Sequence, residues 1–218
     1  MSSEYPKLHF LGEASEISKL NNRLPHWQLQ NSASFITFRL ADSLPSSLLA
    51  EWQIERDQWI ADHPRPWDSA TESEYHRLFS TRLDRALDEG HGSCLLAHDQ
   101  NAKLLRETLE FRDGKEYLLH SWVIMPNHVH VLMSPTAGVT LSKVVAAWKR
   151  FSAIRINKAI GGSGALWQKD YFDRLIRDWD HFANVARYIR RNPEKERLGN
   201  GRYVLWNAPW INRLLTSP

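Results

Sequence analysis

The chain has 218 residues, of which 42% are hydrophobic, and a single cysteine, Cys94. This length predicts one substantial hydrophobic core, while a lone cysteine excludes a disulfide framework and a thiolate zinc cluster and favours a reducing cytoplasm. No apolar stretch approaches the roughly 20 residues that cross a bilayer, and MSSEYPKLHF lacks a signal-peptide pattern. We therefore expect a soluble cytoplasmic protein without a membrane partner.

The charge is distributed unevenly along the chain. Residues 1–142 hold 13 Lys and Arg against 19 Asp and Glu, net −6, whereas residues 143–218 hold 15 against 6, net +9. Clustered cations favour phosphate binding, and Trp148 and Trp167 lie among them, where such rings can stack on unpaired bases. The pattern is also compatible with a solvated surface and core tryptophans. A nucleic-acid partner is thus one of two interpretations.

The first part of the chain predicts one strand followed by helices. Residues 32–42 alternate apolar and polar side chains, which is typical of a strand. Residues 45–62 and 72–89 carry apolar side chains at helical spacing, and residues 63–71 between them predict a loop. We expect a helical insertion at about residues 45–90.

The middle of the chain predicts a hairpin preceded by a helix. Residues 90–99 predict a turn and a short strand, and residues 100–113 a helix ended by Gly114. Residues 117–125 and 129–135 predict two strands joined by a Pro-Asn turn.

The basic part predicts two further helices. Residues 140–159 form a basic amphipathic pattern, residues 166–178 mix turn and strand signals, and residues 180–192 predict a helix that ends before Pro193. Together these elements predict a single α/β (α+β) domain, with a central sheet of about four to five antiparallel strands and helices on one face.

Two histidines stand at alternate positions of the predicted strand in WVIMPNHVHVLMSP. Strand side chains alternate, so His128 and His130 project from one face about 6.6 Å apart along the strand. This spacing is compatible with two nitrogen ligands of one metal ion, and equally with two packed or exposed histidines.

A tyrosine and an amide lie four residues apart on the predicted helix 180–192. Tyr188 and Asn192 therefore share one face, where the amide could join the two imidazoles on Mg²⁺ or Mn²⁺ and the phenol is a candidate nucleophile. The alternative is that Tyr188 packs on the core and Asn192 caps a helix. Tyr171, which follows a WQ turn among charged residues, is a rival nucleophile.

These motifs together resemble a known family. PNHVHVL, WQKDYFDRLIRD and YIRRNPEK, in this order, look like the REP-associated tyrosine transposases (RAYT), relatives of the small single-tyrosine insertion-sequence transposases in the HUH endonuclease superfamily. NRLPHW, FITFRLADSLP and LDEGHGSCLL resemble the N-terminal part of that family. The resemblance covers residues 22–198, which leaves residues 199–218 as a C-terminal extension, and it implies an RRM-like or ferredoxin-like HUH fold.

The resemblance implies an enzyme, a metal-dependent tyrosine transposase. His128, His130 and Asn192 would hold a Mg²⁺ or Mn²⁺ ion, and Tyr188 would attack single-stranded DNA beside a REP-like hairpin to form a 5′-phosphotyrosine. It further implies a bacterial, nucleoid-associated protein, as a monomer or a homodimer. Tyr171 looks like a position where the family accepts other aromatics.

The candidate DNA contacts come from the cations and rings that follow the histidine pair: Lys143, Trp148, Lys149, Arg150, Arg155, Lys158, Trp167 and Lys169.

Three other functions share part of this pattern. A histidine-triad hydrolase requires a third histidine where this chain has Leu132, and a metallo-β-lactamase pattern fails at Val131 and Leu132. A catalytically silent module that binds palindromes remains as the alternative to the enzyme.

Overall fold

The computed structural model describes residues 8, 10, 18–21, 25–28, 32–64, 67–199 and 201–216. The motif at residues 22–27 therefore lies partly outside the described residues. Within them, no helix combines the length and the apolar character that a membrane span requires.

The elements expected from the sequence are mostly present. In chain order they are β1 (Ser18–Asn21), β2 (Pro25–Gln28), β3 (Ser34–Arg39), α1 (Ser46–Asp62), α2 (Ser69–Tyr75), a π-helical turn (His76–Ser80), α3 (Thr81–Asp88), a 3₁₀ turn (Leu95–Ala97), α4 (Asp99–Glu110), β4 (Tyr117–Ile124), β5 (His128–Pro135), α5 (Leu141–Ile160), β6 (Phe172–Leu175), α6 (Trp179–Lys195), β7 (Val204–Asn207) and α7 (Pro209–Thr216). The helices predicted at 45–62 and 72–89 correspond to α1 and to the α2–α3 segment.

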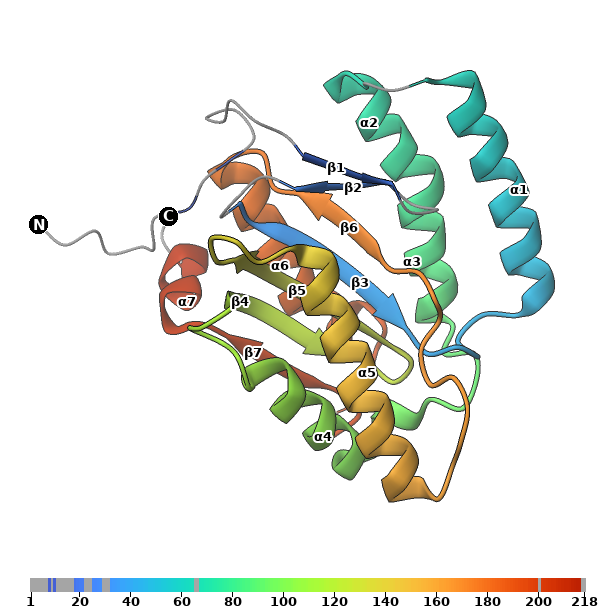
Figure 1. Ribbon diagram of the computed structural model, residues 1–218, viewed down its shortest axis with the longest axis vertical. Helices are drawn as coiled ribbons and strands as arrows, with labels where there is room; N and C mark the ends of the chain where they lie inside the picture. The colour runs from blue at the N-terminus through green and yellow to red at the C-terminus, as the bar shows by residue number, and fades with distance from the viewer. Residues whose placement is uncertain are drawn as a thin grey trace, which may run out of the picture.

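The centre of the molecule is a five-stranded sheet in the order β6-β3-β5-β4-β7, with every neighbouring pair antiparallel (Figure 1). The predicted α/β class with an antiparallel sheet is confirmed. In the register of β3 and β5, Thr37 lies opposite His130 and Arg39 opposite His128. The histidine pair thus lies on the central strand, at the end adjoining the β4–β5 turn.

Helices cover both faces of the sheet. Val129 and Val131 of β5 belong to the core shared with α4 and α5, whereas Leu132 belongs to the core shared with α6 and α7 (Figure 1). The expectation of helices on one face was wrong, because every residue of β5 is buried and a strand buried on both sides needs two covering layers.

Two boundaries also differ from the sequence-based prediction. Residues 90–99 hold no short strand; Cys94 has a left-handed backbone (φ 49°) that leads into the 3₁₀ turn. Helix α6 does not end before Pro193 but continues to Lys195. A proline in the last turn removes one helical hydrogen bond without breaking the packed turns before it.

The C-terminal residues complete the sheet and its second core. β7 pairs with β4, with Trp206 opposite Trp122, and Ile211 of α7 is buried beside α6. These residues, expected to form an extension, therefore cover one edge and one face of the same sheet.

A buried histidine outside the candidate site marks a packing constraint. The register of β4 against β5 shifts between Leu119 and Ser121, which leaves His120 facing α6 and α7. Its Nε2 lies 2.9 Å from Ser134 Oγ, and its ring packs edge-on against the rings of Phe182 and Trp210. Burial lowers the pKa of His120 to about 3.

This burial predicts a loss of stability in acid. The folded-state pKa of His120 lies below its ordinary value of 6.5, so its neutral form stabilises the fold above pH 6.5, and that contribution falls between pH 6.5 and about 3. The difference corresponds to roughly 5 kcal/mol. Urea unfolding at pH 7, 5 and 4 should give a shallower decline of the unfolding free energy for His120→Gln than for the natural chain. His98→Gln, at an exposed position, is the control and should keep the full decline of the unfolding free energy with falling pH. An equal decline for His120→Gln and the natural chain would contradict the prediction.

Candidate metal and nucleophile site

The two histidines of β5 meet at their ring nitrogens. His128 and His130 are fully buried, and their Nε2 atoms lie 3.1 Å apart. Two nitrogen ligands at right angles on one ion, each about 2.1 Å from it, would be separated by about 3.0 Å. The pair is therefore spaced like two ligands of a single cation.

The turn residue Asn127 determines which nitrogen of His128 carries the proton. Asn127 Nδ2 lies 3.2 Å from the carbonyl oxygens of both Leu87 and His91, so this end of the amide is the donor. Its Oδ1, 2.8 Å from His128 Nδ1, must then accept a hydrogen bond. His128 is thus protonated on Nδ1, and its Nε2 presents a lone pair.

Thr37 is the hydrogen-bond partner of the Nδ1 atom of His130. Its Oγ1 lies 2.8 Å from His130 Nδ1, and a hydroxyl can donate or accept. Without a cation, His130 Nε2 donates to His128 Nε2 while Thr37 donates to His130 Nδ1. With a cation, Nδ1 donates to Thr37 and both Nε2 lone pairs become free.

Both rings are neutral near pH 7. Burial lowers the pKa of His128 to about 4, and burial together with the neighbouring His128 holds the pKa of His130 well below its ordinary value. Neutral imidazole is the form that binds metals, so protons do not compete for these nitrogens at neutral pH.

Helix α6 presents three polar side chains to the pair at four-residue intervals. Tyr188, Asn192 and Glu196, the last at the C-cap, lie along one face of the helix. The Tyr188 ring packs edge-on against His130, with centroids 5.3 Å apart. Asn192 is 1% exposed, and neither its Oδ1 nor its Nδ2 has a hydrogen-bond partner among the described residues.

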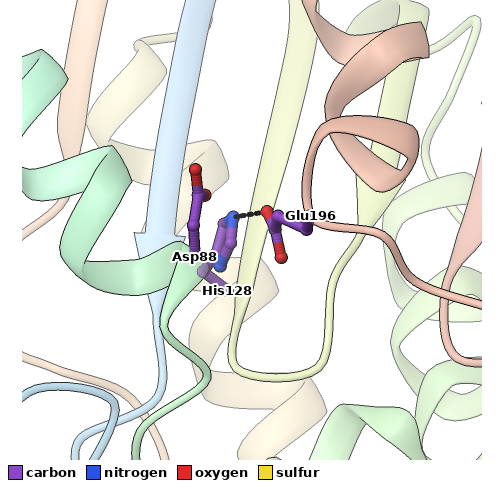
Figure 2. A group of neighbouring side chains, drawn as sticks. All are labelled: Asp88, His128 and Glu196. Atoms are coloured by element: carbon purple, nitrogen blue, oxygen red, sulfur yellow. Dashed lines mark ion pairs between the residues drawn. The ribbon is translucent and has the colours of Figure 1, made fainter.

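Two carboxyl groups lie beside His128. Figure 2 shows Asp88 from the end of α3 and Glu196 from the end of α6 on either side of the ring. The ligand atoms of the three residues lie within 4.8 Å of one another, and Glu196 Oε1 is 4.0 Å from His128 Nε2. Asp88 Oδ2 accepts a hydrogen bond of 2.8 Å from Lys195. Burial raises the pKa of Glu196 to about 9, and hydrogen bonding to Asp88 acts in the same direction.

These groups fit a divalent cation. The side-chain oxygens Asn192 Oδ1, Glu196 Oε1 and Asp88 Oδ1 are buried without a hydrogen-bond partner in the described part of the chain. Buried polar atoms normally have partners, and unpartnered ones cost roughly 1–3 kcal/mol each. Imidazole nitrogens together with amide and carboxylate oxygens suit Mn²⁺, and the oxygens suit Mg²⁺.

The phenol of Tyr188 is bound by a carboxylate of α3. Tyr188 Oη donates a hydrogen bond of 3.0 Å to Asp84 Oδ2. Burial, followed by the charge of Asp84, raises the pKa of Tyr188 far above its ordinary value. Burial also raises the pKa of Asp84 to about 6, against the opposing effect of the hydrogen bond from Tyr188.

Tyr171 lies elsewhere. Its ring belongs to the core between the sheet and α5, on the face opposite the histidine pair. Tyr188, which contacts His130, is therefore the phenol that the fold brings to the candidate metal ligands.

The predicted DNA contacts of α5 lie on the opposite face of the sheet from the histidines (Figure 1). Lys143, Arg150 and Lys158 are exposed on α5, and Lys169 is exposed after it. Lys149 donates to the carbonyl oxygens of Gln168 and Lys169. The histidines therefore face α6 and not α5.

Three further members of that predicted set are engaged in packing. Trp148 and Trp167 are buried, and their Nε1 atoms donate to Tyr117 Oη and Ser152 Oγ. A buried ring offers no face to a base, which argues against stacking at these positions. Arg155 forms an ion pair with Glu107.

Sequence reasoning missed five polar residues of the site: Thr37, Asp84, Asp88, Asn127 and Glu196. Glu196 continues the four-residue spacing of Tyr188 and Asn192, but the spacing was not followed past Pro193. Asp84 carries no sequence signal, and Asp88 has none beyond its place in LDEGHGSCLL, because only the packing of α3 brings the two carboxyl groups to this site.

Comparison with known proteins supports the resemblance. The family model described as "Transposase IS200 like" matches residues 95–192, which include both histidines, Tyr188 and Asn192. Among solved structures, one described as "Structure of the REP associates tyrosine transposase bound to a REP hairpin" is 16% identical, with a TM-score of 0.45, over 77% of this chain and 69% of that chain. A Deinococcus radiodurans protein, provisionally described as a transposase, is 16% identical, with a TM-score of 0.36, over 82% of this chain and 95% of that chain. Curated proteins gave no match.

A cation at this site should stabilise the fold. We expect MnCl₂ to raise the melting temperature of the natural chain, because a ligand at a hundred times its dissociation constant adds about 2.7 kcal/mol. His128→Ala should abolish the shift and Asn192→Ala should reduce it. His120→Gln, which alters a buried histidine on the same face outside the site, should retain it. An equal shift in His128→Ala would contradict the assignment.

Proposed function

Residues 95–192 match the IS200-like transposase family model, and we propose that this chain is a transposase of that kind, which cleaves and rejoins single-stranded DNA through a covalent tyrosine–DNA intermediate. The observation that carries the proposal is the packing of Tyr188 against His130, within a cluster of buried metal-binding groups. A phenol beside such a cluster is placed to attack a phosphate that the cluster holds.

Each residue has a distinct role in the proposed reaction. His128 and His130 hold a Mg²⁺ or Mn²⁺ ion, and Asn192 is the third ligand; Glu196, 4.0 Å from His128, is a further oxygen donor. Asn127 and Thr37 keep the two rings oriented through their Nδ1 atoms. Tyr188 is the nucleophile, and its ring is held by His130 and Phe35.

A divalent cation bound here would polarise a non-bridging oxygen of the scissile phosphate. Tyr188 Oη attacks phosphorus, and the P–O3′ bond breaks, which yields a 5′-phosphotyrosine and a free 3′-hydroxyl. Because the phosphoester is retained in the covalent intermediate, a later 3′-hydroxyl can displace the tyrosine and join the strands without ATP.

The proposed substrate is single-stranded DNA that carries a REP-like hairpin. This assignment rests on the sequence motifs that resemble the REP-associated tyrosine transposases. On the face of the sheet that holds the site, Arg187 and Arg191 are exposed beside Tyr188 and Asn192 in the sequence of α6. We propose these two cations as backbone contacts near the scissile phosphate, with Lys143, Arg150, Lys158 and Lys169 as contacts for DNA that reaches the opposite face.

The nucleophile is tested by removing one oxygen atom. Tyr188→Phe should bind a pool of hairpin oligonucleotides with randomised flanks as well as the natural chain does, but form no protein–DNA adduct on a denaturing gel. Tyr171→Phe is the matched control and should form the adduct. A normal yield from Tyr188→Phe would reassign the nucleophile, and binding without any adduct from the natural chain would indicate a silent palindrome-binding module.

The cation requirement is tested by chelation and titration. EDTA should abolish adduct formation by the natural chain, and Mn²⁺ should restore it. High Mn²⁺ should partly rescue Asn192→Ala, which keeps both imidazoles, and rescue His128→Ala less. Full activity in EDTA would exclude the metal mechanism.

A further inference from the structure

Helix α3 forms one wall of the site, although it lies far from the histidines and from α6 in sequence. Leu87 O accepts a hydrogen bond from Asn127, Asp88 pairs with Lys195, and Asp84 accepts the phenol hydrogen of Tyr188. These contacts connect α3 to the β4–β5 turn and to two turns of α6. The segment of residues 46–88 therefore contributes side chains to the reaction centre in addition to covering the sheet edge.

A buried phenol needs an acceptor for its proton before it can attack. A phenol ordinarily has a pKa of about 10, so little free phenolate is present near neutral pH and the proton must leave during the attack. A positioned acceptor within hydrogen-bond distance of Oη would remove this barrier. The question is which neighbouring group can take the proton.

Most polar groups around Tyr188 are engaged elsewhere. His130 Nδ1 bonds to Thr37 and its Nε2 to His128. Asp88 Oδ2 is paired with Lys195, and Glu196 Oε1 lies 4.0 Å from His128 Nε2. Among the hydrogen bonds of the described residues, Tyr188 Oη has one acceptor, Asp84 Oδ2 at 3.0 Å.

We propose that Asp84 is a catalytic residue that accepts the proton of Tyr188 as the phenol attacks the scissile phosphate. The Oη–H bond breaks and the proton passes to Asp84 Oδ2, while an electron pair on Oη forms the bond to phosphorus. The P–O3′ bond breaks with its electron pair on the 3′ oxygen, which takes a proton from solvent. This inference rests on the proposed function, because it concerns the same nucleophile.

The reverse reaction uses the same contact. When a 3′-hydroxyl attacks the phosphotyrosine, the leaving group is a phenolate whose conjugate acid is very weak. The attacking 3′-hydroxyl loses its proton to solvent as its oxygen bonds to phosphorus, and a protonated Asp84 returns a proton to Oη as the bond from Oη to phosphorus breaks. One carboxyl group is thus the base in cleavage and the acid in rejoining. Its surroundings include Asp88 on α3 and Tyr188, Lys195 and Glu196 at α6.

The test is Asp84→Asn, which keeps an oxygen that can accept the phenol hydrogen bond but cannot take up its proton. We expect single-turnover adduct formation to slow by about 10²- to 10⁴-fold, with unchanged affinity for the hairpin oligonucleotide pool by fluorescence anisotropy. The rate of the natural chain should level off above about pH 6, whereas that of Asp84→Asn should keep rising about tenfold per pH unit as hydroxide replaces the base. Glu89→Gln, an exposed carboxyl at the end of α3, is the matched control and should behave like the natural chain.

A purely positioning role predicts a different result. Asp84→Asn would then keep the natural rate and pH profile, and that outcome would overturn the inference. If Asp84→Asn lowers the melting temperature markedly, Asp84→Glu decides the question: a partly retained rate with a shifted plateau supports proton transfer, and an unshifted plateau overturns it. Tyr188→Phe, assayed in parallel, separates the role of Tyr188 as nucleophile from the role of Asp84 as its proton acceptor. An adduct formed by Tyr188→Phe would contradict the proposed function itself.

Discussion

The side-chain amide of Asn127 is the interaction on which the geometry of the site depends. Its Nδ2 donates to Leu87 O and His91 O, and these two contacts leave Oδ1 to accept from His128 Nδ1. One side chain thus fixes the β4–β5 turn to the end of α3, sets the tautomer of His128 and directs the lone pair of its Nε2 toward His130. An aspartate here could not donate, so the tie to α3 would be lost together with the defined tautomer.

The second constraint is the separation of the two faces of the sheet. Alternation along β5 directs Val129 and Val131 into the core under α4 and α5, and the two histidines toward α6. The exposed cations of α5 and the reaction centre are therefore divided by the whole sheet. DNA that contacts both must pass around an edge of the sheet, whereas Arg187 and Arg191 of α6 lie on the same side as Tyr188, the proposed nucleophile.

The site concentrates features that a core normally avoids. Two neutral imidazoles, an amide with two unpartnered polar atoms and a carboxyl with a raised pKa lie together below the surface of the described residues. Such groups cost stability in an apolar interior, and the apolar core on the same face of the sheet, which includes Phe182, Ile189 and Leu132, offsets that cost. A cation would satisfy several of these groups at once, which explains why their burial is compatible with a folded protein.

The sequence by itself determined the local features of this protein. Period-two alternation predicted β3, the apolar runs on either side of the Pro-Asn turn predicted β4 and β5, and helical spacing predicted α1, α5 and most of α6, because these patterns depend on neighbours along the chain. The same periodicities placed His128 beside His130 and Tyr188 beside Asn192. Only the tertiary structure decided which face each helix covers, that Trp148 and Trp167 are core, and that Asp84 reaches the phenol of Tyr188. Contacts across about a hundred residues arise from packing of apolar faces, and packing leaves no local pattern at the polar residues that it brings together.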